Sequence, residues 1–290
     1  MSYLLFGAAD TLGRLLRICL AIILAALGAL LAPAGVTAAA ITYDCHARSA
    51  RTAAVPEPPA SDPAPWQCRT PWSSAHAATA VLWQRKSLEY CRLTVTAYAT
   101  ALRAAQAYAK APHHSWIVIM DADETILDNS LFEREQQACN LNVTDARWRK
   151  WERAGLAEAV PGAVAFVQAV RSMGGLVAIV TNRHADNDGY TRANLHRLGL
   201  EFDFEIGQGA RDPSNKASRW NDAVKTLAQH YPGARPVMWI GDQVTDLAIR
   251  NPDGSIQRPM SQSDAGDGIG DYLFLIPNPM YGNWQANPDN

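Results

Sequence analysis

Residues 116–130 read WIVIMDADETILDNS, and the architecture of the chain can be worked out from this segment. Its first part, WIVIM, is an apolar run with the length of a strand that is buried on both faces. Asp121, Asp123 and Glu124 follow at once. Acidic residues at the end of such a strand can form a surface turn or a helix cap. Alternatively, these acidic residues take part in a chemical reaction.

Further apolar runs of strand length follow, and helical patterns separate most of them. The runs are LVAIVT at 176–181, FDFEIG at 202–207, PVMWIG at 236–241 and YLFLIP at 272–277. Helical patterns cover 75–110, 161–175, 188–200 and 215–231. Strands that alternate with helices predict crossover units in a mostly parallel sheet. We therefore predict an α/β fold, a Rossmann-like three-layer sandwich, with a small helical cap inserted at about 131–160.

The N-terminal segment has the pattern of an export signal. Arg14 and Arg17 precede an apolar run that ends in small residues at Ala38 and Ala40. This order predicts a signal peptide at 1–40 and a periplasmic or secreted protein. An uncleaved anchor is the alternative, and it would associate the protein with a membrane. Proline-rich sequence then predicts an extended tether at 41–74, ahead of the α/β domain at 75–290.

Charge and cysteine content narrow the possible partners. The formal net charge of −2 provides no global field to attract a nucleic-acid polymer. Beyond the predicted signal, the cysteines are Cys45, Cys68, Cys91 and Cys139, an even set in a compartment that permits disulfides. They allow three pairings, and we favour a Cys45–Cys68 bridge because it would tie down the proline-rich segment. The oligomeric state does not follow from the sequence.

The ends of the predicted strands carry polar residues of complementary kinds. They are Asp121 and Asp123 after the first strand, Thr181 and Asn182 after the second, Lys216 after the third, and Asp242 and Asp246 after the fourth. Ligands of open α/β sheets bind outside the carboxyl ends of the strands. Asp121 and Asp242 would form a hard oxygen site suited to Mg²⁺, while Lys216 and a hydroxyl could hold a phosphate. Together these groups meet the needs of phosphoryl transfer.

At these residues the sequence resembles the haloacid dehalogenase (HAD) superfamily. The resemblance lies in D-x-D-x-T at Asp121–Thr125, a threonine that ends the second strand, a later lysine, and G-D-x-x-x-D at Gly241–Asp246. The segments DADETILDNS, VPGAVAFV, VTNR and IPNPMYGNW are similar to class C acid phosphatases, which include bacterial surface 5'-nucleotidases. The likeness covers roughly residues 78–284, and the lid matches mainly through its tryptophans. Many such relatives are lipoproteins, whereas this chain lacks a lipid-attachment cysteine.

The resemblance implies roles for the acidic pair and for the phosphate-binding residues. Asp121 would be the nucleophile that forms an aspartyl phosphate. Asp123 would be the general acid for the leaving oxygen and then the general base for water. Thr181, Asn182 and Lys216 would bind the phosphoryl oxygens.

The resemblance also implies a metal site and a substrate site. Asp121, the Asp123 backbone carbonyl and Asp242 would hold Mg²⁺, and Asp246 would orient Lys216. Trp148 and Tyr281 fall where the family stacks the aromatic group of its substrate, which points to nucleoside monophosphates. Trp148 and Trp151 are three residues apart, so both could instead pack one helix face into a core.

We expect a secreted, Mg²⁺-dependent phosphomonoesterase of the acid phosphatase or 5'-nucleotidase type, acting on a small-molecule substrate. Two alternatives stay open. One is a binding or storage protein that keeps the fold without turnover. The other is a phosphotransferase that uses an alcohol as acceptor in place of water. The presence of Asp121, Asp123, Lys216 and Asp242 favours an enzyme.

Overall fold

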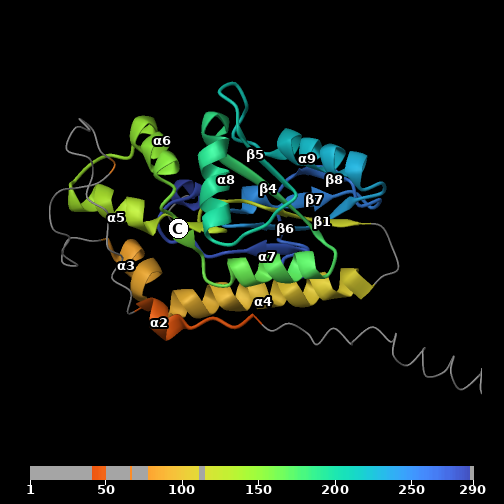
Figure 1. Cartoon of the computed structure of the whole chain (residues 1–290), viewed down its shortest axis with the longest axis horizontal. Coiled ribbons are helices and arrows are strands. Elements are labelled where there is room, and N and C mark those ends of the chain that lie inside the picture. The colour runs from red at the N-terminus through yellow and green to blue at the C-terminus, as the bar shows by residue number, and fades with distance from the viewer. Residues whose placement is uncertain (1–40, 50–65, 67–77, 111–114, 288–290) are drawn as a thin grey trace, which may run out of the picture. The chain divides into compact units, whose positions relative to one another are not determined.

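The computed structural model describes residues 41–49, 66, 78–110 and 115–287 (Figure 1). The predicted signal at 1–40 and most of the predicted tether at 41–74 therefore lie outside the described residues. Within the tether, Cys45–Ser49 form helix α2, and Trp66 is buried. Among the described helices, none combines the length and the apolar character needed to cross a membrane. The division of the chain into domains stays a prediction.

A parallel sheet of five strands forms the centre of the fold, in the order β5-β4-β1-β6-β9. The strands are β1 (Trp116–Met120), β4 (Leu176–His184), β5 (Phe204–Gln208), β6 (Arg235–Gly241) and β9 (Leu273–Leu275). Each neighbouring pair runs parallel, and each strand corresponds to one of the apolar runs in the sequence. The predicted α/β fold with a mostly parallel sheet is confirmed. Because the strand order reverses beside β1, a crevice is expected between the carboxyl ends of β1 and β6.

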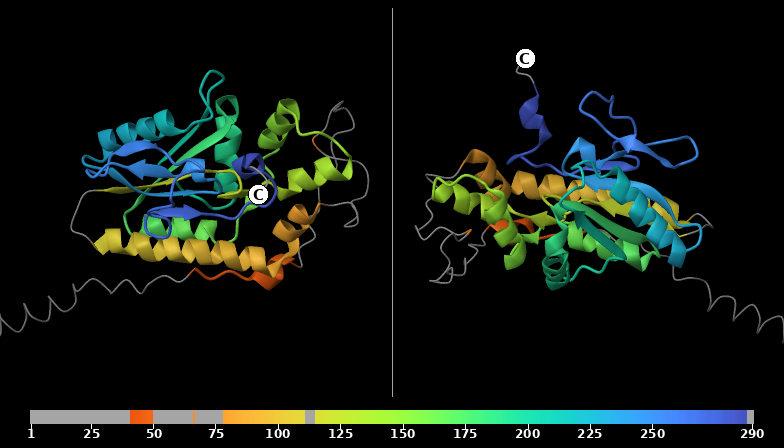
Figure 2. Two further views of the ribbon diagram at one scale, coloured as in Figure 1. Left: turned by 180° about the vertical axis from the view of Figure 1, so that it is seen from behind. Right: turned by 90° about the horizontal axis from the view of Figure 1, so that it is seen from above.

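Helices cover both faces of the sheet (Figure 2). Alternate side chains of β1 point to opposite faces, with Val118 and Met120 in one core and Ile117 and Ile119 in the other. The first core includes residues of α4 (Leu88–Lys110), α7 (Ala163–Ser172) and α8 (Asp188–Arg197). The second includes residues of α9 (Ala217–His230) and of an unpredicted hairpin, β7 (Ala248–Arg250) and β8 (Ile256–Pro259). The arrangement is the predicted three-layer sandwich.

The helical segment predicted at 75–110 is two helices rather than one. α3 (Thr79–Lys86) and α4 are separated at Ser87, whose backbone is extended. The Ser87 hydroxyl accepts a hydrogen bond from the Tyr90 N–H at 3.0 Å. A serine that caps a helix in this way competes with continuation of the preceding helix. The apolar periodicity of the segment concealed this break.

A disulfide joins α2 to α4. Cys45 is bonded to Cys91, and their Cα atoms are 5.7 Å apart. The predicted Cys45–Cys68 bridge is therefore wrong. The pairing depends on how α2 packs against the start of α4, and cysteine spacing contains no information about that contact. Cys139 is also disulfide-bonded.

An insertion of two helices lies beside the carboxyl edge of the sheet. Strands β2 (Leu127–Asp128) and β3 (Glu158–Ala159) pair antiparallel and enclose α5 (Ser130–Ala138) and α6 (Asp145–Ala154). These helices occupy the segment in which we expected the cap. Their connection to the sheet through one short strand pair places α6 near the loop that follows β1.

Candidate active site

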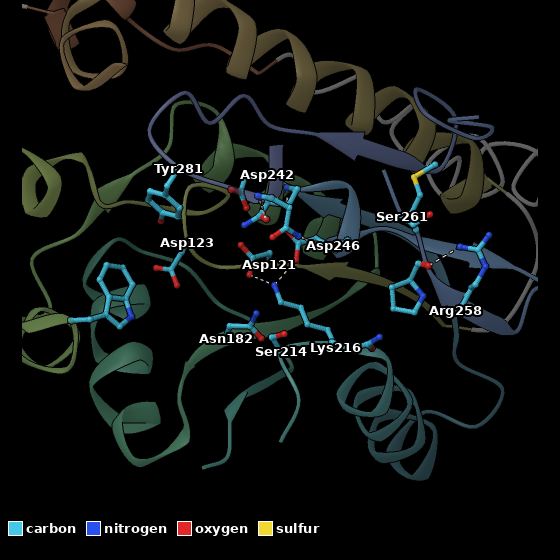
Figure 3. A pocket seen from close by; sticks show the side chains of 17 residues that line it. Asp121, Asp123, Asn182, Ser214, Lys216, Asp242, Asp246, Arg258, Ser261 and Tyr281 are labelled. Atoms are coloured by element: carbon cyan, nitrogen blue, oxygen red, sulfur yellow. Dashed lines mark hydrogen bonds and ion pairs between the residues drawn. The ribbon is translucent and has the colours of Figure 1, made fainter. Parts of the chain in front are cut away.

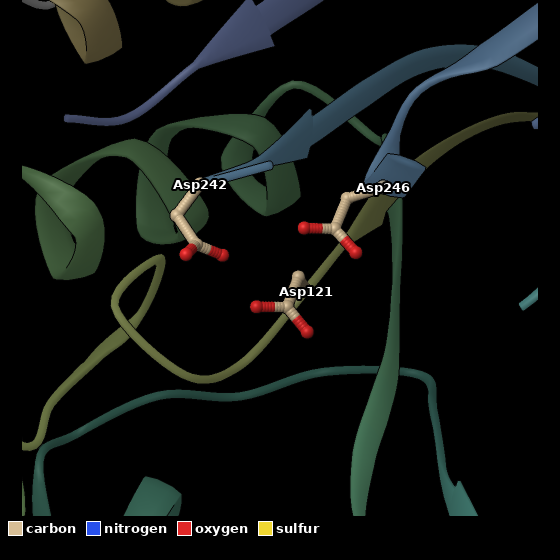
Figure 4. A group of neighbouring side chains, drawn as sticks. All are labelled: Asp121, Asp242 and Asp246. Carbon is tan, nitrogen blue, oxygen red and sulfur yellow. The ribbon is translucent and has the colours of Figure 1, made fainter. Parts of the chain in front are cut away.

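The crevice between β1 and β6 holds a cluster of carboxylates. Asp121 follows β1, Asp242 follows β6, and Asp246 ends a short 3₁₀ helix in the same loop. One carboxylate oxygen from each of these three residues lies within 4.8 Å of the other two (Figure 4). Gly241 permits this approach, because a Cβ atom there would lie 2.2 Å from the Asp246 Cβ. Asp242 and Asp246, the two aspartates of G-D-x-x-x-D, therefore both lie close to Asp121.

Lys216, which follows strand β5 in the chain, is in contact with this carboxylate cluster. It precedes α9, is 4% exposed, and donates hydrogen bonds to Asp121 Oδ1 and Asp246 Oδ1, the latter at 2.7 Å (Figure 3). Burial alone would lower the pKa of Lys216, but the two carboxylates outweigh burial and hold that pKa above its usual value. Lys216 is therefore charged, and it lies between the predicted nucleophile and the aspartate predicted to orient it.

Burial and crowding disfavour the ionised forms of the carboxylates. The pKa of Asp121 is raised to about 7, mainly by burial; Lys216 lowers it, and Asp246 and Asp123 contribute to the rise. Burial, followed by Asp246 and Asp121, raises the pKa of Asp242 well above its usual value. In both cases burial is the largest cause, and neighbouring carboxylates that share a single ammonium group add to it.

The residues present fit a divalent cation. With all three carboxylates ionised, they and Lys216 leave two negative charges, which a divalent ion would balance. The donors are all oxygen, as Mg²⁺ prefers. Asp242 is also fixed in place, since Asn278 Nδ2 donates to its Oδ2 at 2.8 Å.

Asp123 points into a cavity beside the carboxylates and is held by a hydrogen-bond network (Figure 3). Its Oδ1 accepts from Arg183 Nε and from Asn129 Nδ2, each at 2.8 Å. Asn129 Oδ1 in turn accepts from Arg183 Nη2 at 2.9 Å and from Trp151 Nε1 at 2.7 Å. Arg183 and Asn129 were not predicted as site residues. The signal for Arg183 was its position in VTNR, directly after two predicted phosphate-binding residues.

The loop after β4 is shaped by a buried arginine. Arg219, on α9, donates to the Thr181 backbone oxygen and to Asn182 Oδ1, the latter at 2.6 Å. Thr181 is fully buried, and its hydroxyl accepts from the Arg183 N–H at 3.1 Å, whereas Asn182 lines the cavity. Arg219 was missed because no local motif distinguishes it from other charged residues of an amphipathic helix.

A cavity of about 630 Å³ opens beside the carboxylates. Trp148 and Tyr281 both line it, while Trp151 is buried in the core. The two tryptophans of α6 therefore have different surroundings, Trp148 at the cavity and Trp151 in the core. Neither substrate contact alone nor core packing alone describes the pair. The Tyr281 hydroxyl donates to Glu124 Oε2, and the Arg183 guanidinium lies 5.7 Å from the centre of the Trp148 ring.

Comparison with known sequences identifies related proteins. The model of the HAD superfamily, subfamily IIIB (acid phosphatase) matches residues 52–284. Acid phosphatase 1 of Solanum lycopersicum is 25% identical over 163 residues, which are 56% of this chain and 57% of that protein. The stem 31 kDa glycoprotein of Glycine max is 26% identical over 175 residues, 58% of this chain and 60% of that protein. The chain thus spans less than two thirds of the length of these two relatives.

Comparison with solved structures gives the same family. The class C acid phosphatase from Bacillus anthracis superimposes with a TM-score of 0.58 at 26% identity, covering 71% of this chain and 85% of that one. A structure of the enzyme from the same organism with tungstate bound gives 0.57 at 25% identity, with the same coverage. The family match extends over most of the chain and agrees with the fold. The chain belongs to the HAD superfamily, subfamily IIIB, the acid phosphatases.

Proposed function

We propose that the protein is a Mg²⁺-dependent acid phosphatase that hydrolyses phosphomonoesters through an aspartyl phosphate. The observation that carries the proposal is the convergence of Asp121, Asp242 and Lys216 in one crevice, with Asp123 directed into the adjoining cavity. The structure of the related enzyme with tungstate supports it, because tungstate is a tetrahedral oxyanion like phosphate.

In the first half-reaction, an oxygen of Asp121 attacks phosphorus opposite the ester oxygen. The new bond between Asp121 and phosphorus forms as the bond to the leaving oxygen breaks. Asp123 gives its proton to that oxygen, so that an alcohol departs. Arg183 and Asn129 hold the Asp123 carboxyl group toward the cavity during this transfer.

In the second half-reaction, water attacks the phosphorus of the aspartyl phosphate. Asp123, now ionised, accepts a proton from this water, and the bond between phosphorus and Asp121 breaks. Inorganic phosphate leaves, and both aspartates return to their starting states. The same side chain thus acts first as acid and then as base.

Positive charge and hydrogen-bond donors hold the transferring group. Lys216 and Asn182 would bind the phosphoryl oxygens, and the Thr181 hydroxyl retains a hydrogen that it can donate to them. Asp121, the Asp123 carbonyl and Asp242 would hold Mg²⁺, which when bound supplies charge that offsets the negative charge of the phosphoryl group. Asp246 would keep Lys216 in place.

We propose nucleoside monophosphates as substrates, since Trp148 and Tyr281 line the cavity and could contact a flat base. We also propose export, to the periplasm or beyond, from the signal pattern at residues 1–40.

Asp121→Asn tests the proposal. This variant should keep its fold, as checked by circular dichroism, and should not turn over p-nitrophenyl phosphate, because an amide is not a competent nucleophile here. Retained turnover would sink the nucleophile assignment. A panel of nucleoside, sugar and aryl phosphates, each with and without Mg²⁺, tests the substrate class and the metal separately.

A further inference from the structure

The C-terminal strap, residues 276–284, is hydrogen-bonded along the loop that follows β6. These bonds are Ile276 N–H to the Gly241 carbonyl at 2.9 Å, Asn278 Nδ2 to Asp242 Oδ2 at 2.8 Å, Asn283 N–H to Gln243 Oε1 at 3.0 Å, and Asn283 Nδ2 to Thr245 Oγ1 at 3.0 Å. On the other side of the cavity, the Tyr281 hydroxyl donates to Glu124 in the loop that follows β1. The strap therefore connects the loops that carry Asp121 and Asp242.

Asn278 uses both ends of its amide within this strap. Its nitrogen donates to the Asp242 carboxylate at 2.8 Å. Its oxygen accepts from the Met280 N–H at 2.9 Å and from the Tyr281 N–H at 3.4 Å. Only a side chain with a donor and an acceptor on one planar group can make both sets of bonds. One side chain thus contacts a proposed metal ligand and fixes the turn that presents a proposed substrate contact.

The first residue of the strap, Ile276, is buried in the core, whereas residues 277–284 are only partly buried or exposed. A second cavity, of about 510 Å³, borders the strap there and is lined by apolar groups that include Leu93, Ala97 and Trp284. Asp242 and Asn278 line this cavity too. Trp284 is 45% exposed. Beyond Ile276 the strap is held largely by hydrogen bonds, and those of Asn278 link Asp242 directly to the turn at Tyr281.

We propose that Asn278 is a positioning residue that couples the metal site to the aromatic wall of the substrate site. The proposal rests on the proposed function, since it assumes a cation at Asp242 and a substrate group against Tyr281. A cation that orders Asp242 also orders Asn278, and through it the turn at Tyr281. Coupling of this kind is reciprocal, so substrate contact at Tyr281 strengthens the binding of the cation.

Asn278→Leu tests the coupling, because leucine has a similar size and makes neither set of bonds. The Mg²⁺ concentration at the midpoint of the Mg²⁺-induced rise in melting temperature should increase about 10-fold or more, as for other residues that orient metal ligands. At saturating Mg²⁺, the KM for p-nitrophenyl phosphate should rise more than the KM for glycerol 2-phosphate, which has no aromatic group. A loss of fold alone would not change this ratio of KM values.

Asn221→Leu is the matched control, since Asn221 is exposed on α9 and bonds only to a carbonyl of its own helix among the contacts that the structure gives it. It should leave the Mg²⁺ midpoint and the ratio of KM values unchanged. If the Mg²⁺ midpoint and the ratio of KM values were the same in Asn278→Leu as in wild type, the proposal would be overturned.

Asn278→Asp removes the donor of this side chain and keeps an acceptor, so it separates the bond to Asp242 from the bonds to the turn. It also provides a test if Asn278→Leu does not fold. Its carboxylate still accepts from the Met280 and Tyr281 N–H groups but cannot donate to Asp242. Because the turn at Tyr281 is kept, the ratio of KM values should stay closer to wild type than in Asn278→Leu, and a ratio changed as much as in Asn278→Leu would contradict the assigned role. A wild-type protein that neither binds Mg²⁺ nor hydrolyses either ester would instead refute the proposed function.

Discussion

Arg183→Met should slow catalysis by removing one of the two hydrogen bonds that hold Asp123. Arg183 is almost completely buried and donates to Asp123 Oδ1 at 2.8 Å. The other bond, from Asn129 Nδ2, remains. Asn129 also keeps its bond from Trp151 at 2.7 Å, so the rest of the network has a support without the guanidinium. The substitution therefore acts mainly on the orientation of Asp123.

The size of the effect follows from the bond that is lost. A hydrogen bond that involves a charged group, here the Arg183 guanidinium, contributes about 1.5–3 kcal/mol. If that energy orients Asp123 for proton transfer, kcat should fall by about 10- to 150-fold, since about 1.4 kcal/mol corresponds to a factor of ten. The kcat of Arg183→Lys should lie between those of wild type and Arg183→Met, because an ammonium group cannot bond to both Asp123 and Asn129 with the geometry of a guanidinium.

The assay is kcat for p-nitrophenyl phosphate at saturating Mg²⁺, with the melting temperature measured in parallel. Arg153→Met is the matched control, since Arg153 makes a bond of similar length, 3.0 Å, to Asn187 and is absent from the cavity lining. Its kcat should stay within about 2-fold of wild type. If folded Arg183→Met also stayed within about 3-fold, the reasoning that Arg183 positions Asp123 would be refuted.

Three further predictions concern stability. Mg²⁺ should stabilise the wild-type protein by about 2.7 kcal/mol at a concentration 100 times its dissociation constant, and Asp242→Asn should abolish this in thermal melts; an unchanged Mg²⁺ response in the variant would exclude Asp242 as a ligand. Replacing Cys45 and Cys91 by serine opens a loop with a sequence separation of 46 and should cost at most about 4 kcal/mol of unfolding free energy in non-reducing urea titrations; no change would mean that the bridge does not constrain the unfolded chain. Burial, followed by Asp188, raises the pKa of Glu205 from 4.5 to about 7, so the native state binds this proton more tightly and stability from Glu205 is lost as pH rises from 4.5 through 7. Glu205→Gln should flatten the pH dependence of the melting temperature across that window, and an equally steep dependence in the variant would contradict it.

The sequence was sufficient to predict the sheet because the relevant signals are local. An apolar run of five or six residues followed by polar ones marks a strand and its carboxyl end, as at WIVIM before Asp121. A parallel sheet then brings those ends to one edge, which is why Asp121, Lys216 and Asp242 could be grouped without coordinates. Distances and partners did not follow from this reasoning.

Residues that support the site were missed because their contacts join distant segments. Arg183 reaches Asp123 over a sequence separation of 60, and Asn278 reaches Asp242 over one of 36. An arginine or asparagine at such positions is compatible with a solvated loop, so only the fold distinguishes the two cases. The Cys45–Cys91 pairing escaped prediction for the same reason.

The helical insertion contributes to the candidate site at two points. Trp148 lines the cavity, whereas Trp151 donates to Asn129, which holds Asp123. One helix thus lines part of the cavity and, through Asn129, supports the proposed proton-transfer group.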